Sequence, residues 1–422
     1  MRQSRIKKLF RFLGPGFITG AADDDPSGIA TYAQTGAAFG YTQLWFALFV
    51  TPFMIAVQEM CGRIGLVTGK GLAGVMRRHY SPLLLTATVS LLFAANAVNI
   101  GADLGAMADA MELVTGASSI GWLFAFTMLI LVLEVFVSYR TYAKVLKVLC
   151  ISLFAYVLVA FTVSEPWVEI LRSTLLPSFA FSEAYLVNLV ALFGTTISPY
   201  LFFWQADEEV EEEVLRKKLT DMGRGIPRVT NREMSSMRLD TAYGMVFSNL
   251  TTFFIITTAA TTLGAHGIRA VATAAEAAAM LQPLAGRFAS LLFAAGIIGT
   301  GLLAVPILAG SASYAIAEAF GWKEGLFRTV RQAPGFYGII VASTAIGLLV
   351  NLLNIPAFQM LYFAAILNGI IAPPLLIVIL LIGNNRSVMG GRTNSIRSNV
   401  LGWSIAAIMS LAAGVLLMTI LF

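Results

Sequence analysis

Long runs of apolar residues, separated by short polar segments, make up most of the chain. A helix that crosses a bilayer needs about 20 mostly apolar residues, and the sequence contains eleven runs of roughly that length. They lie at about 14–37, 42–66, 82–114, 119–138, 143–163, 184–206, 239–263, 284–320, 335–354, 357–382 and 399–421. The pattern predicts an all-α polytopic membrane protein, with residues 1–422 forming a single transmembrane domain.

The first apolar run is interrupted by charged and turn-forming residues. Residues 23–31 read DDDPSGIAT, and a charge at membrane depth costs at least about 2.5–3.5 kcal/mol and usually serves a function. Pro26 removes a backbone donor and Gly28 permits an unwound turn, so we expect the helix to break here. A broken membrane helix is tolerated where its freed backbone lines a cavity. The run therefore predicts a cation site.

The sixth apolar run is interrupted in a similar way. Pro199 follows the small polar residues Thr195, Thr196 and Ser198. The two interrupted runs head two blocks of five, one at about 14–163 and one at about 184–382, with an extra helix at about 399–421. Blocks of opposite orientation, each led by a broken helix, are typical of secondary transporters.

Charge distribution sets the expected orientation. Only 12% of the residues are charged, against about 25% in soluble domains. All but three of the 28 Lys and Arg residues fall in segments that would share one side of the membrane. The positive-inside rule then predicts a plasma (inner) membrane protein with a cytoplasmic N-terminus and an extracytoplasmic C-terminus. Its expected partners are the lipid bilayer and metal ions, with no nucleic acid and no bound cofactor, and the sequence does not define an oligomeric state.

An acidic run follows the sixth apolar run. Residues 207–219 read DEEVEEEVLRKKL. We expect a solvated helix face with ion pairs four residues apart, such as Glu212–Arg216 and Glu213–Lys217.

These motifs together resemble the natural resistance-associated macrophage protein (Nramp) family of divalent-metal transporters. The resemblance rests on GPGFITGAADDDPSGIATYAQTGAAFGYTQLW, GRIGLVTGK, GTTISPYLFFWQ and NGIIAPPLLIVILLIGNNRSVMGG. It implies a leucine-transporter-like fold of two inverted five-helix repeats plus an eleventh helix, with helices 1 and 6 broken. It also implies a transporter and not an enzyme.

The resemblance implies a metal site between the two breaks. Asp25 matches the family's metal-binding aspartate, and capping of the broken helix is its alternative role. The backbone carbonyls of Ala22 and Thr195 match positions that lend oxygen in the family. Gly28 stands where the family has a coordinating asparagine. Ser198 replaces its methionine and either contributes a hydroxyl or only packs.

Five further residues are expected in the cavity or just behind the metal's ligands: Asp24, Asp103, Tyr200, Gln205 and Ala365. Tyr200 and Gln205 replace two histidines of the family, and Ala365 replaces a glutamine. Asp103 matches a carboxylate of the family's proton route, and a structural hydrogen bond to Asn99 or to another helix is its alternative.

These departures point away from the softer transition-metal ions. A thioether is a soft ligand, and its loss leaves oxygen donors of the kind that Mg²⁺ and Mn²⁺ prefer. Loss of three long side chains should also enlarge the cavity, and Mg²⁺ usually keeps several of its waters. The chain thus looks like the family's divergent branch of Nramp-related magnesium transporters.

The expected function is import of divalent cations, chiefly Mg²⁺ with Mn²⁺ also plausible, as partly hydrated ions by alternating access without strong proton coupling. The alternative is a proton-coupled Mn²⁺/Fe²⁺ importer of the ordinary Nramp type. A passive channel would need a continuous pore. An intramembrane aspartyl protease would need a Gly-x-Gly-Asp string, which the sequence lacks.

Overall fold

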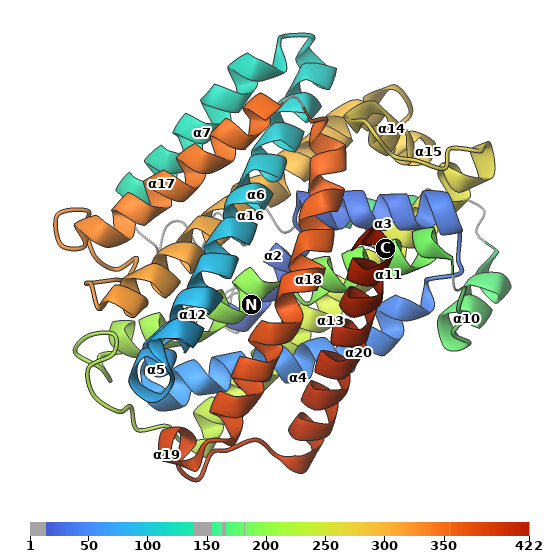
Figure 1. Cartoon of the computed structure of the whole chain (residues 1–422). Coiled ribbons are helices and arrows are strands. Elements are labelled where there is room, and N and C mark those ends of the chain that lie inside the picture. The colour runs from blue at the N-terminus through green and yellow to red at the C-terminus, as the bar shows by residue number, and fades with distance from the viewer. Residues whose placement is uncertain (1–13, 138–153, 163–165, 181, 354, 422) are drawn as a thin grey trace, which may run out of the picture.

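The computed structural model describes residues 14–137, 154–162, 166–180, 182–353 and 355–421, which are almost entirely helical (Figure 1). In this part of the chain, nine helical stretches are long and apolar enough to cross a membrane. The first predicted run, 14–37, forms two short helices in place of one long one. Most of the fifth predicted run, 143–163, lies outside the described residues.

The first half of the chain contains both halves of the first broken helix. The described helices in this half of the chain are α2 (Pro15–Asp23), α3 (Pro26–Phe39), α4 (Trp45–Thr68), α5 (Leu72–His79), α6 (Pro82–Thr115), α7 (Ser119–Phe136), α9 (Phe154–Ala160) and α10 (Trp167–Leu175). Pro26 is the first residue of α3, and Pro82 is the first residue of α6. Proline is favoured there because the first turn needs no backbone donor.

The second half begins with the other broken helix. Its helices are α11 (Glu183–Thr196), α12 (Pro199–Leu215), α13 (Asn231–Thr262), α14 (Ala274–Ala279), α15 (Gln282–Ala285), α16 (Ala289–Phe320), α17 (Pro334–Val350), α18 (Ala357–Asn384), α19 (Arg386–Met389) and α20 (Ile396–Leu421), with 3₁₀ turns at Gly264–His266, Gly286–Phe288 and Asn351–Leu353. Both predicted breaks are therefore present, each closed by a proline that starts the next helix.

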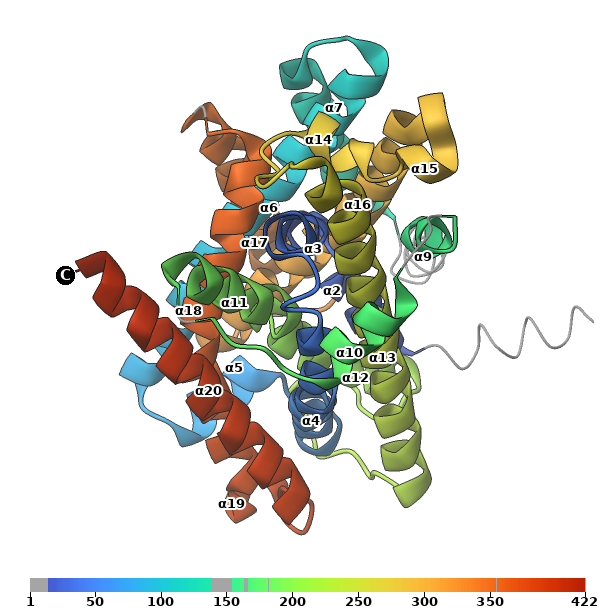
Figure 2. The ribbon, with the colours of Figure 1, turned by 90° about the vertical axis from the view of Figure 1, so that its right-hand side faces the viewer.

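The first broken helix lies at the centre of the molecule. Figure 2 shows α2 and α3 surrounded by α11, α13, α16 and α18, while α20 packs on the outside against α18. Close approach of α2 to α13 needs two glycines. A Cβ atom at Gly20 would lie 2.2 Å from the carbonyl carbon of Gly244, so the two backbones touch at this crossing.

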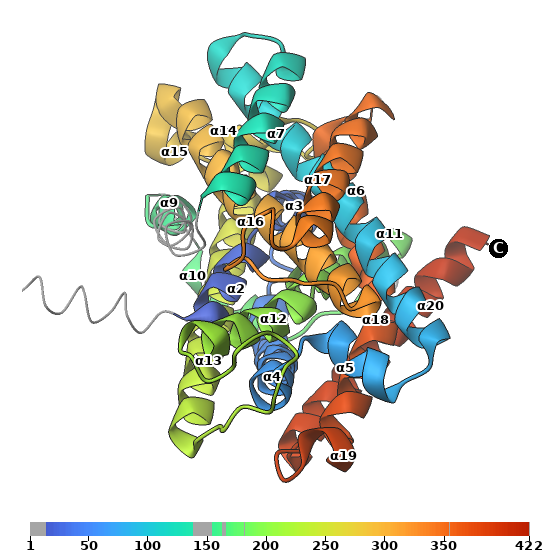
Figure 3. The ribbon, with the colours of Figure 1, turned by 90° about the vertical axis from the view of Figure 1, so that its left-hand side faces the viewer.

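Three of the segments predicted to be cytoplasmic, which contain α5, the start of α13 and α19, lie toward the lower end of the molecule in Figure 3. Arg63 donates to the backbone oxygen of Arg392 at 2.6 Å, and Gly223 donates to that of Gly69 at 2.8 Å. The grouping agrees with the predicted alternation of sides. The orientation of that end in the cell stays a prediction.

The prediction of a solvated acidic face is wrong. Asp207, Glu208 and Glu211 are fully buried, and Glu213 is 1% exposed. The reason is that α12 continues the broken helix without interruption to Leu215 and packs between α4 and α16. Of the two expected ion pairs, Glu212–Arg216 is present at 3.1 Å.

The other expected pair is replaced by a neighbouring one. Glu213 bonds to Lys218 at 3.1 Å, because the helix has ended and Lys217 adopts a left-handed conformation with φ of 60°.

Candidate metal site at the two helix breaks

The first break is held open by Asp25. Asp24 is the last residue associated with α2, and Asp25 is the N-cap of α3 with extended backbone. One of its carboxylate oxygens, Oδ1, accepts hydrogen bonds from the backbone of Gly28 at 2.7 Å and from the hydroxyl of Ser27 at 2.6 Å. The capping role, considered above as an alternative, is therefore real, but it occupies only one oxygen of Asp25.

The other oxygen of Asp25 faces two other helices. Oδ2 accepts a bond from the Asn99 amide of α6 at 3.0 Å and lies 3.4 Å from the Tyr200 hydroxyl of α12. That hydroxyl also donates to the backbone oxygen of Ala22 at 2.8 Å. Tyr200 thus ties the second break to the first.

The second break leaves backbone oxygens at the end of α11. Ile197 departs from helical geometry, and Ser198 is the N-cap of α12. The Ser198 hydroxyl bonds to the backbone oxygens of Gly194 at 2.9 Å and Thr195 at 2.7 Å. Ser198 therefore stabilises the unwound end, and its own oxygen keeps free lone pairs.

Several groups near the site have buried oxygens without hydrogen-bond partners among the described residues. They include both carboxylate oxygens of Asp103 and the side-chain hydroxyl of Thr195. Asp103 lies one turn beyond Asn99 on α6, and Asn99 bonds to Asp25 instead of to Asp103. The alternative role of Asp103, a bond to Asn99, is thus not observed. Unsatisfied buried oxygens are costly unless something positive satisfies them.

Sequence reasoning missed two functional candidates. Asn99 was considered only as a partner for Asp103, yet it holds the carboxylate of Asp25. For Thr195 only the backbone carbonyl was expected to matter. Its hydroxyl lies 3.2 Å from where a Cβ atom of Gly28 would sit. The i, i+4 spacing of Asn99 and Asp103 was the available signal, because it places both on one helix face.

The space beside Gly28 is occupied. A Cβ atom there would lie 3.1 Å from the backbone oxygen of Asp23, 3.2 Å from Thr195 Oγ1 and 3.3 Å from the ring of Tyr32. The expectation that the missing asparagine leaves an open cavity is therefore not met at this position, because neighbouring groups fill the space.

Three other predicted residues lie around the breaks and have no side-chain hydrogen bond to Asp25 among those of the described residues. Asp24 is fully buried and accepts a bond from Ser248 of α13 at 3.3 Å. Gln205 bonds to Glu209 at 3.1 Å and packs against Gly62 of α4. The backbone of Ala365, on α18, presses against Gly194 just before the second break.

The site is closed to solvent in this structure. Asp25 is 2% exposed, and Asn99 and Asp103 are fully buried. Among the described residues, no three His, Cys, Asp or Glu side chains are close enough together to hold a metal ion. A cation at Asp25 would therefore complete its coordination with hydroxyl, amide or backbone oxygens and with water.

The fold matches that of known transporters. It is similar to the manganese transporter of Eremococcus coleocola, solved with an aromatic bis-isothiourea substituted compound, with a TM-score of 0.73 and 17% identity over 97% of this chain and 86% of that one. It is also similar to MhsT in complex with L-phenylalanine, with a TM-score of 0.57 and 11% identity over 96% and 97% of the two chains.

A third similar structure is Mhp1, a nucleobase-cation-symport-1 family transporter, with a TM-score of 0.54 and 12% identity over 97% of this chain and 93% of that one. At such identities the likeness shows the fold alone. The predicted leucine-transporter-like fold is confirmed.

The family is shown by the sequence itself. The model of the family described as natural resistance-associated macrophage protein-like matches residues 16–419, which is nearly the whole chain. The match includes both helix breaks and the residues that surround Asp25. The chain therefore belongs to the Nramp family of divalent-metal transporters, and it is a membrane transporter and not an enzyme.

Proposed function

We propose that this transporter imports divalent cations down their electrochemical gradient, chiefly Mg²⁺ with Mn²⁺ also accepted. The observation that carries the proposal is the set of atoms around Asp25. The groups that contact its carboxylate or flank it across the breaks are hydroxyls, an amide and backbone groups, from Ser27, Asn99, Tyr200 and Ser198. Oxygen donors without a thioether favour hard cations.

A hydrated ion fits this arrangement better than a bare one. Asp25 has a single carboxylate oxygen left after capping, and Asp103 is one helical turn from Asn99. Mg²⁺ loses its waters reluctantly and binds through one or two carboxylates. In the closed arrangement the space beside Gly28 is filled, so we expect room for a hydrated ion only when the two broken helices separate.

Weak proton coupling is proposed from the side chains of the second break. Ser198 and Tyr200 occupy the positions that precede and follow Pro199, and neither titrates near neutral pH when unperturbed. A cell that is negative inside can drive a divalent cation inward without protons, since the potential contributes about 2.3 kcal/mol per charge per 100 mV.

The test is Mg²⁺ flux into proteoliposomes that contain a pH indicator. The wild type should take up Mg²⁺ without internal acidification, and Asp25→Asn should abolish uptake. An asparagine keeps an oxygen for the cap of α3, so this variant should still fold, which thermal unfolding in detergent checks. A proton-coupled Mn²⁺/Fe²⁺ importer would instead acidify the interior, and its Mn²⁺ uptake would be unaffected by millimolar Mg²⁺.

A further inference from the structure

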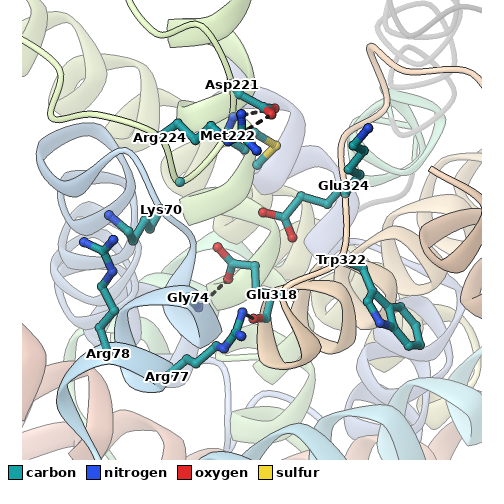
Figure 4. A pocket seen from close by; sticks show the side chains of 13 residues that line it. Lys70, Gly74, Arg77, Arg78, Asp221, Met222, Arg224, Glu318, Trp322 and Glu324 are labelled. Atoms are coloured by element: carbon teal, nitrogen blue, oxygen red, sulfur yellow. Dashed lines mark hydrogen bonds and ion pairs between the residues drawn. The ribbon is translucent and has the colours of Figure 1, made fainter. Parts of the chain in front are cut away.

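A chamber of about 520 Å³ lies at the predicted cytoplasmic end, away from the two breaks. Its walls come from α5 and the turn before it, from the loop that follows α12, and from the end of α16 with the loop beyond it (Figure 4). The volume is within the range of about 300–1,000 Å³ that is usual for sites that bind small molecules. Basic side chains outnumber the carboxylates of its lining: Lys70, Arg77, Arg78, Arg224 and Lys323 against Asp221, Glu318 and Glu324.

Two of the three carboxylates already have partners among the described residues. Glu318 accepts hydrogen bonds from the backbone of Gly71 and Gly74, both at 2.7 Å, and so caps the start of α5. Figure 4 marks the bond to Gly74. Asp221 forms an ion pair with Arg328, which does not line the chamber. The charges of Glu318 and Asp221 are thus largely compensated by groups other than the basic side chains of the chamber.

The third carboxylate, that of Glu324, points into the chamber (Figure 4). Glu324 is 7% exposed, and its Oε2 atom has no hydrogen-bond partner among the described residues. Burial raises the pKa of Glu324 well above its usual range, and the negative charges of Glu318, Asp221 and Glu211 raise it further. The uncharged carboxyl group is therefore favoured, and it offers a hydrogen-bond donor to an anion.

Lys70 and Arg78 form a positive wall of the chamber. They lie together on the side opposite Glu324 (Figure 4), and in the described part of the chain neither belongs to an ion pair. Burial lowers the pKa of Lys70, and the positive charge of Arg78 lowers it further, while Glu318 has the opposite effect. Two neighbouring positive charges without a carboxylate partner repel each other, and an anion beside both removes this cost.

Two arginines extend this positive surface. Arg77 donates to the backbone oxygen of Glu318 at 3.4 Å through one nitrogen, which leaves its other donors unused by that bond. Arg224 lies 3.8 Å from Asp221, a long contact to a carboxylate that Arg328 also holds. A guanidinium group presents five donors in a plane and matches the oxygens of a phosphate group better than any other side chain does.

The chamber lies where membrane-crossing helices end. The apolar stretches of α4 and α16 end at Thr68 and Phe320, one or two residues before the lining residues Lys70 and Gly321. Phe320 stacks on Trp322 with ring centroids 5.0 Å apart, and the two residues are 66% and 44% exposed. Exposed tryptophan is typical of the membrane–water interface, which is also the level of the lipid headgroups.

We propose that this chamber is a binding site for a phosphate group, whose charge Lys70 and Arg78 neutralise and to which Arg77 and Arg224 donate. An anionic lipid and a soluble phosphate compound share this chemistry. Basic pockets between transmembrane helices on the cytoplasmic side bind acidic lipid headgroups. The site is separate from that of Asp25, so it goes beyond cation transport and does not depend on which ion is transported.

The test measures binding of dioleoylphosphatidylglycerol and of inorganic phosphate, in separate titrations, to the purified full-length protein in detergent. Binding is detected as a saturable rise in the midpoint of thermal unfolding. A lipid source predicts binding of phosphatidylglycerol but not of dioleoylphosphatidylcholine, which has no net charge, whereas a soluble source predicts binding of inorganic phosphate. Lys70→Gln and Arg78→Gln should each weaken the binding by about fivefold to tenfold, the usual effect of one charged donor.

The matched control is Arg397→Gln, an exposed arginine at the start of α20 that does not line the chamber, and it should bind like the wild type. Lys70 is partly exposed and Arg78 is exposed, so both chamber variants should keep the wild-type midpoint without ligand, which shows that they are folded. Binding of neither phosphatidylglycerol nor phosphate to the wild type would overturn the site. Equal weakening by Arg397→Gln and the chamber variants would also overturn it, because it would show general attraction of a basic surface for anions.

Discussion

At the scale of single residues, the two oxygens of Asp25 have separate roles. Oδ1 caps α3 through Gly28 and Ser27, while Oδ2 faces Asn99 and Tyr200. One side chain therefore both creates the helix break and presents a charge inside it. A capping aspartate and a cation ligand need not be alternatives.

Tyr200 is the residue whose hydroxyl joins the two breaks, and its removal is a direct prediction. Tyr200→Phe should leave the backbone oxygen of Ala22 short of a donor, which costs about 1–3 kcal/mol when the group is buried. It should also raise the KM for Mg²⁺ by about tenfold, because the carboxylate of Asp25 loses a neighbour that positions it. Transport kinetics in proteoliposomes measure the KM.

The control for this variant is Tyr362→Phe. That hydroxyl donates to Asn188 at 3.0 Å on the other side of α11, so its loss should lower stability without changing the KM. Equal KM values in Tyr200→Phe and the wild type would show that Tyr200 serves the fold only.

At the scale of helices, the site depends on how closely α2 approaches α13. The backbones touch at Gly20 and Gly244. Asp240 of α13 accepts bonds from the backbone of Gly14 and Gly16, both at 2.8 Å, and so satisfies donors at the start of α2. The first half of this broken helix, α2, is thus held to α13 by close packing and by a carboxylate cap.

The packing part of this contact can be tested by Gly20→Ala. The added methyl group would meet backbone atoms of Gly244, and overpacking of this kind costs about 1–3 kcal/mol. We expect a lower midpoint of thermal unfolding in detergent, because α2 can no longer pack closely against α13. Gly414→Ala, where a Cβ atom meets nothing within 4 Å, should be neutral or stabilise by up to about 1 kcal/mol. Identical midpoints for both variants would contradict the close contact.

At the scale of the whole molecule, charge transfer across the membrane distinguishes the proposed mechanism. Two positive charges that cross without compensating protons gain about 4.6 kcal/mol from a potential of 100 mV. Uptake of Mg²⁺ into proteoliposomes should therefore rise when a potassium gradient with valinomycin makes the interior negative, and fall when the potential is set to zero. Uptake that is indifferent to the potential would contradict unaccompanied transport of Mg²⁺.

The position of α12 in the molecule explains why the sequence-based prediction of a solvated acidic face was wrong. Residues 207–213 carry so many acids that a solvated face was expected, but α12 is the second half of a broken helix, and it starts in the centre of the protein. Its acids therefore pack against α5 and α16. Charge composition records how polar a segment is, whereas burial depends on what the rest of the chain places around it.

The sequence alone was enough to determine most of the crossings, the two breaks and the family. Apolar length and proline position act locally, so they can be read without knowledge of neighbours. Only the tertiary structure decided that Asn99 holds Asp25, that Tyr200 joins the two breaks, and that the space beside Gly28 is filled. These contacts join residues far apart in the chain, and their geometry depends on how the helices pack.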